Sequence, residues 1–89
     1  MSQLRTFRPR VRYDLDVKEV SLGLLVYDEA NDRVHYLSAT AAAIFSLCTG
    51  ELDEHQIAQL VADAFELDHL PVRETARCLA DFRREDLLV

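Results

Sequence analysis

The sequence predicts an α+β fold, a three-stranded antiparallel N-terminal sheet packed on a three-helix, winged-helix-like cluster. Up to about residue 37 apolar and polar residues alternate, the period of strands, and from residue 38 apolar residues recur every three or four positions, the period of helices. The chain has 89 residues, 49% of them hydrophobic, which is enough for one core and too short for two domains. We expect a single domain over residues 10–89 after a basic N-terminal arm over residues 1–9.

The first two strands are expected on either side of residue 20. Val11 and Tyr13 alternate with charged residues just after Pro9, which predicts a short first strand. The second strand covers residues 22–27: Leu22, Leu24 and Val26 would share one face, and Leu25 and Tyr27 the other.

The third strand is expected to return antiparallel to the second. Residues 29–32 (EAND) predict a turn, because Asn and Asp tolerate positive φ and bond their own backbone. Residues 33–37 follow as a strand rich in Val, Tyr and Leu. With the first strand on the far side of the second, the third strand keeps an open edge.

Three helices are expected after this sheet. Ser38 is a candidate N-cap of the first, and Gly50 is expected to end it as a left-handed C′ residue. Asp53 and Gln56 have the spacing of a capping box for the second helix, and Pro71 suits the first turn of the third. The expected inner faces are Ala41, Ile44, Phe45 and Cys48; Ile57, Leu60, Val61, Ala64 and Phe65; and Val72, Thr75, Ala76, Leu79 and Phe82. Residues 87–89 could close the core as a terminal extended piece.

Charge is distributed unevenly along the chain. Residues 1–12 carry four Arg and no acid, whereas residues 13–70 carry two basic and twelve acidic side chains. An acidic middle repels the phosphate backbone, so nucleic acid is disfavoured as a partner. No apolar run approaches the ~18 residues of a membrane span, and no secretory signal is visible. We therefore expect no membrane partner and a cytoplasmic location.

The residue types of common catalytic and metal sites are missing from the pattern. Two Gly exclude a GxGxxG or Walker loop, and the three His lack metal-ligand spacing. Cys48 and Cys78 are expected to be buried, inert thiols. Asp28 is expected to be a solvated turn carboxylate, and Asp14 and Asp16 to face water. The sequence predicts a non-enzyme with no cofactor and no metal.

The residues after the hairpin also carry a family resemblance. Residues 34–50, VHYLSATAAAIFSLCTG, combine a short strand, a Thr-Ala pair that opens a helix, an apolar run ending in Leu-Cys, and a Gly turn. In this order and spacing they resemble the PqqD-like family, named for pyrroloquinoline quinone biosynthesis protein D. The resemblance extends over about residues 8–89, with LLVYD at residues 24–28 similar to the family's second strand.

The resemblance implies a peptide chaperone, a recognition element for ribosomally made peptides that are later modified. Such domains bind the leader segment of a precursor and present its core to a separate modifying enzyme, often a radical S-adenosylmethionine enzyme or a leader peptidase in natural product biosynthesis. An open strand edge beside a helix would allow this by strand addition. The expected peptide-binding residues are Arg33, Val34, His35, Tyr36 and Leu37 on the third strand, with Val72, Ala76, Leu79 and Arg83 on the third helix.

Three alternatives stay open at this stage. The third-helix line could belong to the core, with Arg73, Arg77 and Arg84 as a solvated face beside it. A winged-helix DNA-binding transcription factor would use that basic line, and strong salt dependence of binding would identify it. A structural or dimerisation module would bind no leader and would bury a large apolar self-interface.

Overall fold

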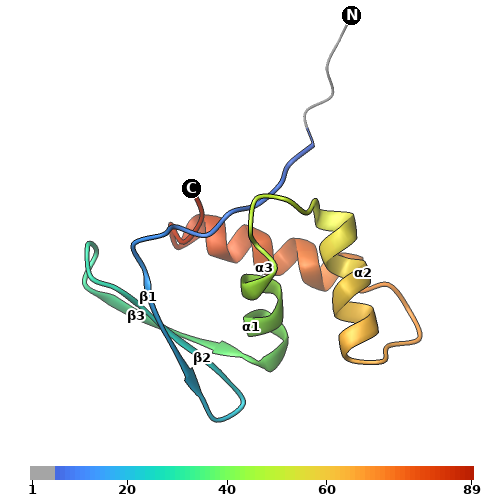
Figure 1. Ribbon diagram of the computed structural model, residues 1–89, viewed down its shortest axis with the longest axis horizontal. Helices are drawn as coiled ribbons and strands as arrows, with labels where there is room; N and C mark the ends of the chain where they lie inside the picture. The colour runs from blue at the N-terminus through green and yellow to red at the C-terminus, as the bar shows by residue number, and fades with distance from the viewer. Residues whose placement is uncertain (1–5) are drawn as a thin grey trace, which may run out of the picture.

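The protein has a three-stranded sheet followed by three helices, as the sequence predicts (Figure 1). The computed structural model describes residues 6–89, so the first five residues of the expected basic arm lie outside the described part. The elements are β1 (Asp16–Val20), β2 (Gly23–Asp28), β3 (Arg33–Ser38), α1 (Ala39–Ser46), α2 (Glu54–Ala64) and α3 (Val72–Arg84). The α+β class is confirmed.

The sheet is antiparallel in the order β1-β2-β3. Leu24 of β2 lies opposite Leu37 of β3, and Val26 lies opposite His35. Among the described residues β3 pairs with β2 alone, so the expected open edge is confirmed.

The position of the first strand was predicted wrongly. The strand is β1, whose sequence DVKEV is exposed almost throughout, and it is held to the sheet by its ladder to β2. Val11 instead forms an isolated bridge with Leu88. Leu22 is also not part of the inner face: it lies in the β1–β2 turn with φ 64° and is 80% exposed.

Gly23 lets β2 and β3 approach closely at one end of the hairpin. A Cβ added at this position would lie 2.0 Å from the carbonyl oxygen of Leu37, a distance that no real contact tolerates. Only a residue without a side chain fits between the two backbones there.

The caps predicted for the helix ends are confirmed only in part. The α2 capping box is present: the Gln56 N–H donates to Asp53 Oδ1 at 2.8 Å, and the Asp53 N–H donates to Gln56 Oε1 at 2.9 Å. Ser38 occupies the N-cap position of α1, but its hydroxyl makes no capping bond. Gly50 has the expected positive φ, 88°, yet it lies in the loop after α1, whose C-cap is Leu47.

The core forms where α1 lies between the sheet and the other two helices. α1 contacts β2, β3, α2 and α3, while α2 packs on α1 and α3. Phe45 and Phe82 meet edge to face with ring centroids 5.6 Å apart. The buried cluster consists of Leu24, Val26, Leu37, Ile44, Phe45, Cys48, Ile57, Val61, Leu79, Phe82, Leu87 and Leu88.

The inner faces of α2 and α3 are narrower than predicted. The expected core residues Leu60, Ala64, Phe65 and Val72 are exposed, and Ala76 is half-buried. Ala58, which the prediction omitted, is buried with Ile57 and Val61.

The N-terminal segment lies between the α1–α2 loop and the end of the described chain (Figure 1). Pro9 is buried and its carbonyl accepts from the Gly50 N–H at 2.9 Å. The Val11 N–H donates to the Cys48 carbonyl, and the Arg12 N–H donates to the Leu87 carbonyl, both at 3.0 Å. Residues 9–12 thus join two segments that are far apart in sequence, and residues 87–89 close the core as expected.

Within residues 6–89, every helix is too short or too polar to cross a membrane.

Candidate functional site

A groove of about 560 Å³ runs between β3 and α3. It begins at the open edge of the sheet and reaches α1 at its floor. The lining residues come from β3, the start of α1, the second half of α3 and the segment after it: Val34, His35, Tyr36, Leu37, Ser38, Ala41, Cys78, Asp81, Phe82, Arg84, Glu85 and Leu87. The groove therefore combines a backbone edge with a partly apolar floor.

On the β3 side, four of the five residues predicted to bind peptide line the groove, and Arg33 does not. Alternation along the strand directs Leu37, which is buried, and His35, which is half-buried, toward the helices. Val34 and Tyr36 are 62% and 57% exposed on the other face. The Tyr36 hydroxyl donates to the Leu22 carbonyl at 3.2 Å, which holds that ring against the β1–β2 turn.

The α3 side of the groove differs from the prediction. None of the four expected residues lines it: Leu79 is 2% exposed and belongs to the core, and the Arg83 guanidinium stacks 4.5 Å from the centre of the Phe7 ring. Val72 is exposed in the first turn of α3, and Ala76 is half-buried outside the groove. The wall is built by Cys78, Asp81, Phe82 and Glu85, a stripe displaced around the helix from the expected line.

Charged side chains of both signs surround the groove. Arg33, at the start of β3, reaches across to Glu85, the C-cap residue of α3, with Nη1 and Oε1 3.5 Å apart. Arg84 and Asp81 pair along the same helix. Because both pairs are exposed, each contributes little to stability, and they can open when a ligand enters.

Two buried side-chain atoms near α3 have no hydrogen-bond partner within residues 6–89. They are His35 Nε2 and Thr75 Oγ1. A buried polar atom without a partner is unfavourable for folding, so His35 is a position in the groove where packing has not been optimised for stability alone.

The two cysteine thiols keep their protons at neutral pH. Burial raises the pKa of Cys48 to about 12, and burial followed by the nearby Asp81 raises the pKa of Cys78. Cys48 Sγ donates to the Ile44 carbonyl at 3.2 Å. Cys78, which lines the groove and is half-buried, therefore offers an apolar surface and no thiolate nucleophile. In the part of the chain that the structure describes, no cluster of three His, Cys, Asp or Glu is arranged to hold a metal ion.

Asp28 is the main residue whose environment the sequence reasoning missed. It is fully buried, and the Arg12 guanidinium binds both of its carboxylate oxygens, at 2.8 and 3.1 Å. Asn31 donates to it at 2.7 Å, while Arg12 also pairs with Asp14 at 2.9 Å. The Arg12 and Asn31 bonds lower the pKa of Asp28 to about 2. Its place in β2, two residues after the inward-facing Val26, was the available signal that it turns inward.

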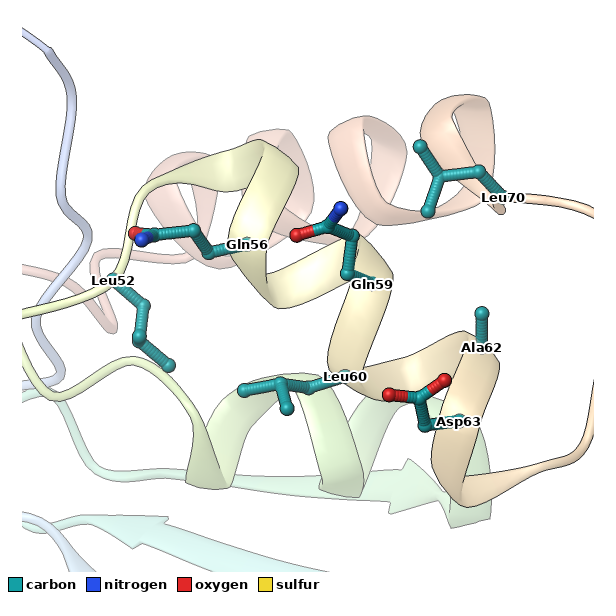
Figure 2. A pocket seen from close by; sticks show the side chains of 7 residues that line it. All are labelled: Leu52, Gln56, Gln59, Leu60, Ala62, Asp63 and Leu70. Atoms are coloured by element: carbon teal, nitrogen blue, oxygen red, sulfur yellow. The ribbon is translucent and has the colours of Figure 1, made fainter.

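A second hollow, of about 540 Å³, lies beside α2, with one residue from the loop before this helix and one from the loop after it (Figure 2). It shares no lining residue with the β3–α3 groove.

In comparisons with known proteins, no family model matches the chain, and no curated protein or solved structure matches it either.

Proposed function

We propose that this protein is a non-catalytic recognition element that binds the leader segment of a ribosomally synthesised precursor peptide. The leader adds as a strand along β3, and its core is presented to a separate modifying enzyme, a radical S-adenosylmethionine enzyme or a leader peptidase. The observation that carries the proposal is that the free edge of β3 runs along a groove that α3 closes on the other side.

The chemistry of the groove suits an extended peptide. Free N–H and C=O groups of an edge strand bind the backbone of any extended chain, so they give affinity without reading sequence. Side chains alternate along such a strand, and every second one would point toward Leu37, Ala41 and Phe82. Apolar leader side chains would therefore anchor the peptide, and their spacing would fix its register.

The leader class of peptide is supported by the resemblance of residues 34–50 to the PqqD-like family. A leader is disordered when free, and binding orders it at a cost in entropy that a short strand and a few anchors can offset. Holding the leader raises the effective concentration of the attached core at the enzyme. Because precursors of this kind are made by ribosomes, we expect the protein to act in the cytoplasm.

A DNA-binding function is the alternative, and the distribution of cations argues against it. Residues 34–72, which include α1 and α2, contain no Lys or Arg. A helix pair without cations has nothing to neutralise phosphates with. Arg73, Arg77 and Arg84 of α3 are exposed, but Arg84 pairs with Asp81, and the remaining cations are a small basic surface.

The proposal is tested by titrating ¹⁵N-labelled protein with the leader of its precursor. We expect the largest amide shifts in β3 and in residues 78–85 of α3. Shifts confined to β1, or no shifts at saturating leader, would contradict the proposal.

A proline scan of the leader gives a second test: at inward-facing N–H groups, proline should cost about 1–3 kcal/mol of binding free energy, because it leaves a β3 carbonyl without its donor.

A matched pair of variants on α3 tests the groove wall itself. Cys78→Leu adds atoms inside the groove and should weaken leader binding about tenfold or more, about 1.4 kcal/mol. Ala76→Leu adds more atoms two residues away, outside the groove, and should leave leader affinity unchanged. Equal effects of the two variants, measured by calorimetry alongside a urea melt of each, would reject the assignment of the wall.

A further inference from the structure

The α2 side of the molecule carries an apolar hollow that the proposed peptide groove does not use. Figure 2 shows Leu52, from the loop before α2, and Leu60, from the middle of α2, turned toward the same space. Leu70, from the loop that enters α3, lines the hollow as well, and Asp63 and Gln59 supply its polar members. Leu60 is 41% exposed although it lies on the helix face whose period predicts burial.

Large apolar side chains continue beyond the hollow along the same segment. Phe65 and Leu67, directly after α2, are each 39% exposed. With Leu60 they place three large apolar side chains at the surface within eight residues of sequence. Single exposed apolar residues are ordinary, but three in one segment, of which Leu60 lines a hollow, are typical of a surface that a partner covers.

The charge around this face has one sign. Residues 51–70 hold six Asp and Glu and no Lys or Arg. This segment supplies no cation of its own, and Asp63 is the charged residue that lines the hollow, so the segment is complementary to a partner with Lys or Arg. Such complementarity steers association and excludes acidic surfaces.

The α2 face is independent of the peptide groove. Among the described residues α2 packs on α1 and α3, whereas β3 packs on β2 and α1. Figure 1 places α2 at the opposite end of the molecule from the hairpin of the sheet. A ligand in one of the two sites therefore leaves the other site open.

We propose that the α2 face, defined by Leu52, Leu60, Asp63, Phe65, Leu67 and Leu70, is a docking surface for a protein partner. The partner presents apolar side chains flanked by Lys or Arg. Identifying this partner as the modifying enzyme rests on the proposed function, under which leader and enzyme bind the two sites at the same time.

The surface is tested with a synthetic amphipathic peptide of Leu and Lys as the probe. It should shift the amides of residues 52–70 in ¹⁵N-labelled protein, and its affinity should fall as salt is added. A Leu and Glu peptide of the same length should bind at least tenfold more weakly. Equal binding of the two peptides, or shifts of the Leu and Lys peptide confined to β3 and α3, would overturn the inference.

Matched variants test whether the Leu and Lys peptide binds at the α2 face. Leu60→Asp should reduce the affinity of the Leu and Lys peptide at least tenfold, and Asp63→Lys should reduce it by loss of charge complementarity alone. Leu22→Asp makes the same change as Leu60→Asp at an 80% exposed leucine in the β1–β2 turn and should have no effect. If Leu22→Asp weakens binding as much as Leu60→Asp does, the surface is assigned wrongly.

Leader binding to the same samples separates this inference from the proposed function. Leu60→Asp should bind leader as the wild-type protein does, since Leu60 lies outside the groove. If wild-type protein binds the leader but not the Leu and Lys peptide, the docking surface is overturned and the proposed function is not. If wild-type protein binds the Leu and Lys peptide but not the leader, the proposed function is overturned and the docking surface is not.

Discussion

The fully buried carboxylate of Asp28 pairs with the mostly buried guanidinium of Arg12, and the pair connects three parts of the chain. Arg12 belongs to the N-terminal segment, Asp28 ends β2, and the Asp86 carbonyl, just after α3, accepts from Arg12 at 2.9 Å. A bidentate pair between a guanidinium and a carboxylate fixes both position and direction. Burial makes the pair costly to break, because either partner alone would be an uncompensated charge.

Asp28→Asn should destabilise the fold at pH 7 and change how stability depends on pH. The native pKa of Asp28, about 2, lies below the ordinary value of about 3.9. The carboxylate therefore contributes stability above the ordinary value, and this contribution is lost as pH falls from about 4 to 2. Urea unfolding between pH 7 and 2 should show a steep loss for wild type and a shallower loss for Asp28→Asn.

Asp16→Asn is the control, because Asp16 is an exposed carboxylate on β1. It should leave the pH profile close to that of wild type. Equal stability of Asp28→Asn and wild type at pH 7 would mean that the buried pair does not hold these segments together.

Among the elements, α2 is the one whose start the sequence specifies completely. The side chains of Asp53 and Gln56 satisfy each other's backbone N–H groups, so the helix begins at Glu54 whatever packs against it. The same kind of local signal places the β2–β3 hairpin, where Asp32 adopts the positive φ, 53°, that Asp tolerates.

Asp53→Ala should lower the free energy of unfolding by about 0.5–2 kcal/mol, because it removes the acceptor for a first-turn N–H. Asp53→Ser keeps an acceptor at the same position and should recover most of this loss. Thermal and urea melts of the two variants provide the measurement. An alanine variant as stable as the serine variant would show that packing alone holds the first turn.

Elements that depend on distant partners could not be predicted in the same way. β1 has charged residues on most positions and no apolar alternation, and it exists because β2 offers it a ladder. Val11 has the pattern of a strand residue, yet its backbone bonds go to Cys48, far along the chain. The wall of the groove was missed for a related reason: the apolar face of α3 packs into the core, and this packing turns the mixed line of Cys78, Asp81 and Phe82 toward β3.

On the scale of the whole molecule, the final residues of the described chain complete the core. Leu87 is 1% exposed and Leu88 9%, and the Val89 N–H donates to the Arg10 carbonyl at 2.9 Å. Leu87 also lines the end of the β3–α3 groove. The stability of the fold and the shape of the groove therefore depend on the same side chain.

Leu87→Ala should cost about 2–5 kcal/mol of unfolding free energy, because it leaves a cavity in the core. Val89→Ala, at a side chain that is 74% exposed, should cost little, since the backbone bond to Arg10 is kept. Urea denaturation of both variants measures the difference. A loss below about 1 kcal/mol for Leu87→Ala would show that this segment is not part of the cooperative unit.

The position of residues 9–12 between the α1–α2 loop and residues 87–89 also constrains the order of events during translation. Residues 9–12 leave the ribosome early, but residues 87–89, one of the two segments that hold them, are made much later. The hairpin and α1 rest on contacts close in sequence and can form early, and Pro9 and Val11 can then bond to the loop after α1. The bonds of Arg10 and Arg12 to residues 87–89 must wait until that segment is made. Until residues 87–89 have left the ribosome, residues 9–12 are held on one side alone, so this part of the fold closes after the hairpin and α1 have formed.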